Sequence, residues 1–272
     1  MSSKVIYEQV GTVAKVWLNN PKAGNATNFD MMREIDHAFK RAVEDDSVKV
    51  IVMLAKGAHF CTGHEQDEDA PNIFEDPSNF SSRATMLESS EETEICMRLR
   101  NTPKPVVAGA QGMVIFHGFS LLSVADIIFA GDTLRVLAMY TNFLPAAYEL
   151  GVRQTKDLLF RQRFLLPKDL EKVGYVKETV QVEELEKTVM AYANDIARND
   201  AYLLRMMKKL CNDAADAQGY SEYQKRMEFT QMAMFASVKD PEYDGKYKFF
   251  DGIPEAIEKM KNDGTNPRRS KM

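Results

Sequence analysis

The sequence predicts an α/β protein with a mostly parallel core, followed by a helical C-terminal region. Apolar runs of strand length alternate with helical stretches through roughly the first 150 residues, which is the pattern of parallel strands joined by helices. After Gly151 the character of the chain changes, and every later element is expected to be a helix.

The chain is expected to open with a hairpin and a long helix. Residues 5–9 and 12–18 flank a turn at Gly11, as the two strands of a β-hairpin do. Asn28 then stands at the N-cap of a helix expected over residues 29–44, because the apolar residues that follow it recur at helical spacing.

A buried strand and a long loop come next. Residues 48–54 form an apolar run that is typical of a strand inside a core. The acidic segment 65–82 contains two prolines and is expected to be a loop. A loop of this length is often a substrate lid. Residues 85–100 then have the pattern of a helix.

The remaining elements alternate and then become helical. Strands are expected at residues 106–108 and 126–130, with a short helix at 119–124 between them. Further helices are expected at residues 156–164, 168–173, 182–197, 201–217, 221–234 and 253–260. This order places the strands in the first half of the chain and leaves the second half to helices.

Composition and charge exclude several classes of protein. A chain of 272 residues with 44% hydrophobic and 28% charged residues is an ordinary globular protein of one large domain or two small ones. Its net charge of −5 indicates no nucleic-acid partner. The three cysteines are too widely spaced for a disulfide framework or a metal site. We expect no membrane span and no signal peptide, and therefore a cytoplasmic protein.

Two glycine-containing turns, each following a strand, carry the functional prediction. The first, residues 60–64, comes after the apolar run 48–54, and the second lies at the end of residues 103–112. Such turns can direct backbone N–H groups into a pocket, where they stabilise a negatively charged oxygen. The sequence therefore indicates an enzyme that polarises a carbonyl group, with two main-chain amides from distant loops converging on one oxygen atom.

Several segments, in this order and spacing, resemble the crotonase (enoyl-CoA hydratase/isomerase) superfamily. They are residues 18–26, 46–52, 60–63, 104–112, 125–130, 157–160 and 170–176. The resemblance implies a spiral of ββα units over residues 1–200 and a helical C-terminal trimerisation region over residues 201–272. It also implies a homotrimer or a dimer of trimers, and an acyl-CoA substrate that brings coenzyme A with it, without a separate cofactor or metal.

The same resemblance assigns roles to residues at the two turns. The N–H of His64 would be the first oxyanion donor, and the N–H of His117 or Gly118 the second. Relatives that add water to a double bond carry a glutamate at each of two later positions. Ser120 and Tyr140 stand at those positions here, so water addition by a glutamate pair is not supported.

Other polar side chains near the turns have both a catalytic and a structural interpretation. His117 is either an acid–base group active near neutral pH or a histidine packed on an apolar face. Glu65 is either a base folded into the pocket or part of a solvated acidic loop. Ser120 could orient a water molecule, and Tyr140 is either a proton carrier or a core aromatic residue.

Four residues lie where the superfamily grips the phosphates and adenine of coenzyme A. They are Lys22, Phe249, Lys259 and Lys261. Lysine suits a phosphate because it carries a compact positive charge. The competing interpretation is that these lysines are solvated side chains of a loop and a terminal helix.

Three functions stay open from the sequence. The first is an acyl-CoA enzyme that works through an enolate, whether by hydration, isomerisation, hydrolysis or C–C cleavage. The second is a CoA-independent β-diketone hydrolase, because a histidine just after the turn at Gln111 and Gly112 resembles the 6-oxocamphor hydrolase branch. The third is a binding subunit that has lost its catalytic carboxylates.

Overall fold

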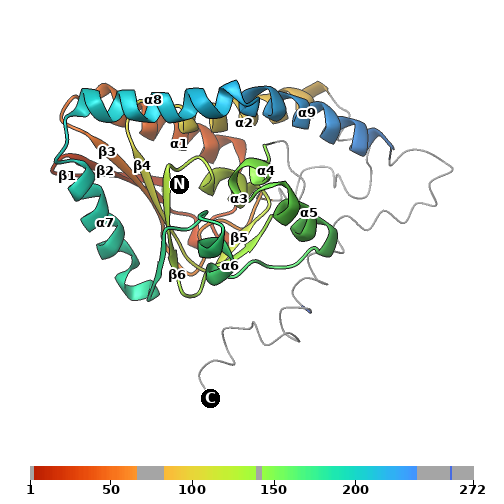
Figure 1. Ribbon diagram of the computed structural model, residues 1–272, viewed down its shortest axis with the longest axis horizontal. Helices are drawn as coiled ribbons and strands as arrows, with labels where there is room; N and C mark the ends of the chain where they lie inside the picture. The colour runs from red at the N-terminus through yellow and green to blue at the C-terminus, as the bar shows by residue number, and fades with distance from the viewer. Residues whose placement is uncertain (1–2, 66–82, 139–142, 238–257, 259–272) are drawn as a thin grey trace, which may run out of the picture.

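The computed structural model describes residues 3–65, 83–138, 143–237 and 258, and it confirms the α/β fold (Figure 1). The strands are β1 (Val5–Val10), β2 (Val13–Leu18), β3 (Val50–Ala55), β4 (Val106–Ala110), β5 (Met113–Ile115), β6 (Ile127–Gly131), β7 (Arg135–Leu137) and β8 (Glu178–Val180). The α-helices are α1 (Phe29–Glu44), α2 (Arg83–Arg100), α3 (His117–Leu122), α4 (Ala146–Glu149), α5 (Val152–Arg161), α6 (Pro167–Lys172), α7 (Leu185–Ile196), α8 (Ala201–Ala217) and α9 (Tyr220–Ser237). Short 3-10 turns, η1 (Pro21–Ala23) and η3 (Val182–Glu184), precede α1 and α7.

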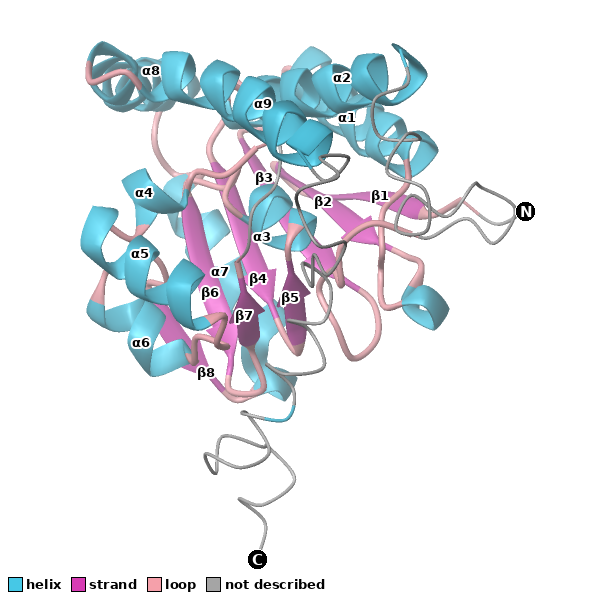
Figure 2. Cartoon of the chain, turned by 90° about the vertical axis from the view of Figure 1, so that its right-hand side faces the viewer, coloured by secondary structure: helices cyan, strands magenta, loops and turns pink. Residues whose placement is uncertain are grey.

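A sheet in the strand order β1-β2-β3-β4-β6-β8 forms the centre of the described chain. β1 and β2 are antiparallel, which confirms the predicted hairpin, and each later neighbouring pair is parallel. β5 and β7 form a separate parallel pair beside this sheet (Figure 2). The mostly parallel core expected from the sequence is therefore present.

Both faces of the sheet are covered, as parallel strands require. β3 is buried at every position, and its alternate side chains enter two different cores. Ile51 and Met53 pack in the larger core with α1, whereas Leu54 packs in the smaller core under α7. A Cβ at Gly109 of β4 would lie 2.9 Å from Val189 of α7. The missing side chain thus lets α7 pack directly on the sheet.

The first long helix begins where the sequence predicts. The side-chain oxygen of Asn28 accepts a hydrogen bond of 2.9 Å from the backbone N–H of Met31, which confirms the predicted N-cap. Met32, Ile35 and Phe39 then lie on the buried face of α1. The capped start matters for the site, because it fixes where Met32 points.

Other boundaries differ from the predicted ones. α3 begins at His117, whereas the predicted helix began at residue 119 and left the histidine outside it. The stretch 182–197 is not one helix but the turn η3 followed by α7. The three-residue strands and the four-residue helix α4 were not predicted, because elements this short contain too few residues for a periodic pattern to repeat. The predicted lid, from residue 66 onward, and all of helix 253–260 except residue 258 lie outside the described residues.

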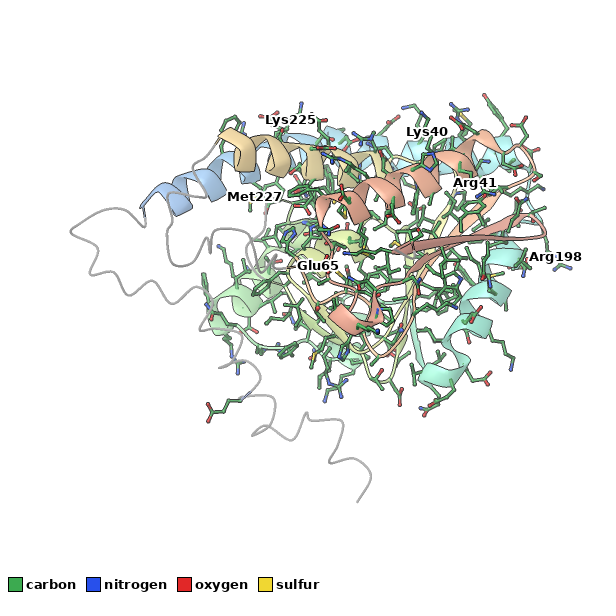
Figure 3. All side chains as sticks on the ribbon, turned by 180° about the vertical axis from the view of Figure 1, so that it is seen from behind. Lys40, Arg41, Glu65, Arg198, Lys225 and Met227 are labelled. Carbon is green, nitrogen blue, oxygen red and sulfur yellow. The ribbon has the colours of Figure 1, made fainter. Side chains whose placement is uncertain are left out.

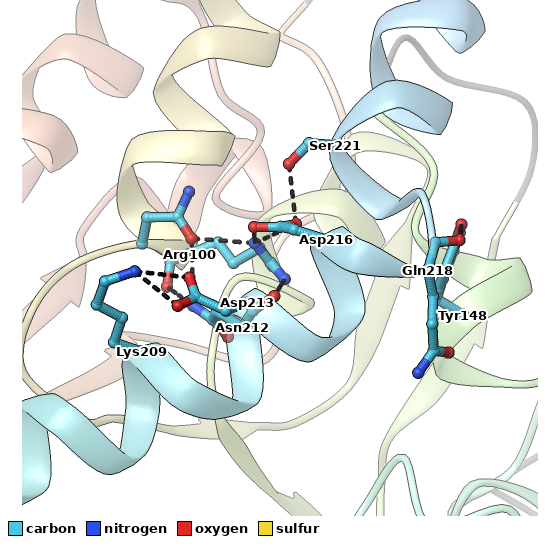
Figure 4. Close-up of polar contacts among 9 residues, drawn as sticks. Arg100, Tyr148, Lys209, Asn212, Asp213, Asp216, Gln218 and Ser221 are labelled. Atoms are coloured by element: carbon cyan, nitrogen blue, oxygen red, sulfur yellow. Dashed lines mark hydrogen bonds and ion pairs between the residues drawn. The ribbon is translucent and has the colours of Figure 1, made fainter.

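The helical C-terminal region is joined to the core by buried cations. α8 and α9 lie across the top of the molecule, over α1 and α2 (Figure 1). Arg100, at the end of α2, is 3.1 Å from Asp216 of α8 (Figure 4). It also lies over the ring of Tyr220 at 4.1 Å. Lys208 of α8 is 2.8 Å from Asp126, whose carboxylate also accepts from the N–H of Val106.

Replacing Lys208 by methionine should destabilise the fold. The variant leaves the Asp126 carboxylate without its cation, and because that side chain keeps 27% of its surface exposed we expect a loss of about 2 kcal/mol in the free energy of unfolding. Urea denaturation measures the change. The matched control is Lys209→Met, whose exposed pair with Asp213 should contribute less than about 0.5 kcal/mol. Equal stability of the two variants would show that Lys208 does not anchor α8.

Candidate active site

The two turns predicted from the sequence lie side by side. Cys61, in the first turn, pairs with Val114 of β5 in a parallel bridge. The N–H of Cys61 donates to the carbonyl of Met113 at 3.3 Å, and the N–H of Ile115 donates back to Cys61 at 3.0 Å. The first turn therefore extends the small β5-β7 sheet and runs directly into the region before α3.

The backbone N–H of His64 takes no part in the hydrogen bonds that its neighbours form with Thr27. Thr27 donates to the carbonyl of Gly63 and accepts from the N–H of Glu65, each at 2.8 Å. His64 lies between these two hydrogen bonds. In a parallel bridge, the backbone N–H of such a residue points away from the paired segment, here the one that contains Thr27. Among the described residues, no group accepts a hydrogen bond from the His64 N–H.

The second predicted donor lies where α3 begins. Phe116, just before the helix, has φ 51° and ψ −109°, a conformation that costs a non-glycine residue about 1–3 kcal/mol. Its own N–H donates to Leu137 at 2.9 Å. The next amides, those of His117 and Gly118, have no acceptor in the described part of the chain.

Glycine at position 118 allows the two segments to touch. A Cβ there would lie 2.2 Å from the carbonyl oxygen of Cys61, which is much shorter than any permitted contact. The first turn of α3 consequently rests on the first predicted turn. The side chains show the same closeness, because the rings of His64 and His117 stack with centroids 4.6 Å apart and planes inclined by 26°.

A buried carboxylate lies against both histidines. Glu92 of α2 is 3% exposed, and its Oε1 is 3.2 Å from Nδ1 of His117 and 3.6 Å from Nδ1 of His64. His117 is fully buried, whereas about half of the His64 side chain is exposed. The cluster therefore runs from the core, through the carboxylate, to an imidazole that contacts solvent.

The two ring nitrogens of His117 face different acceptors. The sulfur of Met32 lies 3.4 Å from Nε2, whereas Nδ1 faces the Glu92 carboxylate at 3.2 Å. Burial lowers the pKa of His117 to about 4, against the opposing effect of the Glu92 carboxylate. The imidazole is consequently neutral at pH 7.

Two imidazoles and a carboxylate are also a familiar metal-binding set. Their donor atoms lie within 4.8 Å of one another. A metal bonded to both nitrogens must lie in the plane of both rings, about 2.0–2.1 Å from each nitrogen. Planes inclined by only 26° in a stacked pair meet well beyond that distance, so one ion cannot bind both rings in this arrangement.

Other predicted side chains have structural partners. The hydroxyl of Ser120 donates to the carbonyl of Phe143 and is fully buried. Glu65 lies near the N-terminal end of α1 (Figure 3), where its carboxylate accepts from Lys4, Asn20 and Asn28. The structure thus engages both side chains in holding segments together rather than in the histidine cluster.

Of the residues predicted to contact coenzyme A, the structure describes only Lys22. Lys22 is exposed in η1, and the next residues touch the first turn, since the N–H of Thr62 donates to Gly24 at 3.1 Å. The remaining predicted site residues lie outside the described residues: Tyr140, Phe249, Lys259 and Lys261.

Sequence reasoning missed Glu92. The residue lies on the same face of α2 as Ile95, Cys96 and Leu99, each of which is at most 1% exposed. Spacings of three, four and seven residues define one face of a helix. A glutamate that shares this spacing with apolar residues is expected to lie on the buried face of the helix, so the sequence contained a signal for the burial of Glu92.

Comparison with known proteins gives the family. The model of the Enoyl-CoA hydratase/isomerase family matches residues 8–252, and the chain belongs to that family. A probable enoyl-CoA hydratase from Mycobacterium smegmatis superposes with a TM-score of 0.79 at 27% identity, covering 88% of this chain and 98% of the other. A probable enoyl-CoA hydratase from Mycobacterium thermoresistibile superposes with a TM-score of 0.77 at 29% identity. The superposition covers 87% of this chain and 99% of the other. A short-chain-enoyl-CoA hydratase of Clostridium acetobutylicum is 24% identical over 77% of this chain and 81% of its own length.

The membership establishes an enzyme of the acyl-CoA-acting crotonase type. None of the helices in the described residues is both long enough and apolar enough to cross a membrane. The mixed α/β architecture with helices on both sides of the sheet matches that of the structural neighbours.

The buried His117 makes stability depend on pH. Its pKa is about 4 when folded and about 6.5 when unfolded, so between these values the unfolded chain binds a proton that the folded chain does not. Stability should therefore fall as the pH drops, by about 2 kcal/mol from pH 7 to pH 5.

Urea unfolding at the two pH values measures this effect. In His117→Asn the difference between pH 7 and pH 5 should shrink by that amount, whereas the exposed His37→Asn control should keep the wild-type difference. An unchanged difference in His117→Asn would contradict the neutral, buried imidazole.

Proposed function

We propose that the chain binds an acyl-CoA thioester and stabilises the enolate form of its carbonyl with two backbone N–H groups. The donors are the N–H of His64 and the N–H of His117 or Gly118. The supporting observation is that these amides lie on segments in direct contact and have no acceptor among the described residues. Removing one donor of this kind costs about 3–4 kcal/mol in the best-studied enzyme.

The reaction is one in which an enolate forms or collapses next to the thioester. Ser120 occupies a position where hydratases of the family carry a glutamate, and its hydroxyl is engaged with Phe143. Simple hydration therefore needs another acid–base group. Isomerisation, hydrolysis and C–C cleavage all proceed through the same stabilised oxygen and are consistent with this site.

The pair of stacked imidazoles at the two turns favours a second candidate function. The half-exposed ring of His64 can donate to the enolate of a β-diketone after C–C cleavage, without coenzyme A. Such an enzyme would turn over a cyclic 1,3-diketone and would not bind thioesters. Including a diketone in the ligand panel below distinguishes the two functions, and a chain that binds neither is a non-catalytic subunit.

Calorimetry with acetyl-, crotonyl- and acetoacetyl-CoA tests the first function. We expect at least one thioester to bind, and the Lys22→Ala variant to weaken binding about fivefold, as for one exposed charge–phosphate contact. Binding of the matching N-acetylcysteamine thioester, which lacks phosphates, should not change. Lys40→Ala, an exposed lysine on α1, is the matched control. Failure of the wild-type protein to bind any member of the panel would reject the acyl-CoA assignment.

We also propose that the helical C-terminal region is the trimer interface. α8 presents Leu203, Met206, Met207 and Leu210 outward at helical spacing, and Leu210 is 71% exposed. A contiguous apolar stripe on a soluble protein marks an interaction surface.

Light scattering after size-exclusion chromatography tests the interface. The wild-type protein should be a trimer or hexamer, and Leu210→Glu should shift it towards monomer because it places a charge in the apolar contact. Arg205→Glu, on another side of α8, should leave the mass unchanged. A monomeric wild-type protein would exclude this interface.

A further inference from the structure

We infer that Gln224 of α9 is a positioning residue, which holds helix α3 in place through the peptide group between Phe143 and Leu144. The inference rests on the proposed enolate chemistry, because it concerns the backbone N–H groups that α3 contributes to it. It gives the helical C-terminal region a role in the site itself, in addition to the proposed contact between subunits.

One peptide group is hydrogen-bonded to side chains of two helices that are far apart in the sequence. The hydroxyl of Ser120, in α3, donates to the carbonyl oxygen of Phe143. The N–H of Leu144 belongs to the same peptide group and donates to the side-chain oxygen of Gln224 at 3.1 Å. Because a peptide group is planar and rigid, the two bonds form one continuous connection from α9 to α3. Hydrogen bonds in such a chain also polarise and strengthen each other.

All four residues of this connection are buried. The exposed fraction is 0% for Ser120, Phe143 and Gln224, and 2% for Leu144. Water therefore cannot take the place of the Gln224 side chain, and without it the N–H of Leu144 loses its hydrogen-bond partner. The orientation of this peptide group, and of Ser120 against it, thus depends on α9.

The Gln224 side chain is only half satisfied by hydrogen bonds. Tyr220, Gln224 and Met227 share the buried face of α9, at spacings of four and three residues. The amide oxygen of Gln224 is bound to Leu144. The amino group interacts with the hydroxyl of Tyr220 but makes no well-aligned hydrogen bond among the described residues. A buried polar group in this state is costly, and native proteins keep such groups mainly at functional sites.

α3 depends on this support because it is short. The helix has six residues and follows the unusual backbone of Phe116. A helix of this length is not stable by itself, so contacts with the rest of the fold set its direction. Ser120 lies in the same turn as His117 and Gly118, and a shift of Ser120 therefore moves the N–H groups of those two residues. A misplacement of about 1 Å can cost an enzyme about 100-fold in rate.

The acidity of bound acetoacetyl-CoA measures how well these N–H groups are placed. The thioester ionises between its two carbonyl groups without an enzyme base, and its enolate absorbs in the near ultraviolet. Groups that stabilise the enolate oxygen lower the pKa of the bound compound. The titratable groups of the site, His64, His117 and Glu92, are the same in every variant, so differences between variants report the placement of the N–H groups.

Replacing Gln224 by methionine should weaken the stabilisation of the enolate. The wild-type protein should lower the pKa of bound acetoacetyl-CoA below that of the free thioester. Gln224→Met keeps the length of the side chain but removes the oxygen that accepts from Leu144. It should raise the pKa of the bound thioester by about 1, a tenfold loss, while calorimetry gives the wild-type affinity for free coenzyme A. Lys225→Met, at the exposed next position of α9 (Figure 3), is the matched control and should show no change.

Further variants separate positioning from general stability. Ser120→Ala releases the other end of the same peptide group. The double variant with Gln224→Met should therefore shift the pKa by about 1 rather than about 2. Val189→Ala, in the smaller core under α7, should unfold at lower urea concentration yet leave the pKa unchanged. Gln224→Asn, whose oxygen ends one carbon short of Leu144, should shift the pKa in the same direction and serves if the methionine variant folds poorly.

The outcomes separate this inference from the proposed function. If the wild-type protein does not bind acetoacetyl-CoA, or binds it without lowering its pKa, the proposed enolate chemistry is overturned and the inference with it. A lowered wild-type pKa that Gln224→Met and Gln224→Asn leave unchanged overturns the inference alone. A double variant whose shift equals the sum of the single shifts, or a Val189→Ala shift as large as that of Gln224→Met, does the same.

Discussion

The site depends on the close approach of Gly118 to the carbonyl of Cys61. Because position 118 has no side chain, the first turn of α3 rests on the first glycine-containing turn. The pairing of Cys61 with Val114 and the unusual backbone of Phe116 hold this contact in place. Everything proposed for the site follows, since two amides and two imidazoles are brought together by one backbone contact.

Burial and the Glu92 carboxylate act on the pKa of His117 in opposite directions. Burial makes a charged imidazole costly, whereas the neighbouring carboxylate favours it, and the effect of burial is the larger. The lowered pKa of His117 follows from the same burial that surrounds Glu92. Met32 completes the arrangement, because its sulfur lies 3.4 Å from Nε2 on the far side of the ring. A single apolar setting thereby keeps an imidazole neutral beside a buried carboxylate.

Sequence reasoning found the backbone part of the site and missed the side-chain part. His64, His117 and Gly118 were predicted because glycine turns after strands are visible as local patterns. Glu92 was not considered, since it sits between Glu91 and Glu94 in a segment that is acidic overall. Its burial depends on how α2 packs against α1 and α3. The same limit applies to Glu65, whose partners come from three separate segments.

The sequence by itself determined the α/β class, the hairpin, the cap of α1 and the two turns, because each is encoded by neighbouring residues whose spacing matches one local geometry. Only the tertiary structure decided that Lys208 of α8 pairs with Asp126, and that Glu92 meets His64 and His117. These contacts join residues more than twenty positions apart. Their formation depends on packing and on the burial of charge, and no single segment of the sequence determines either of them.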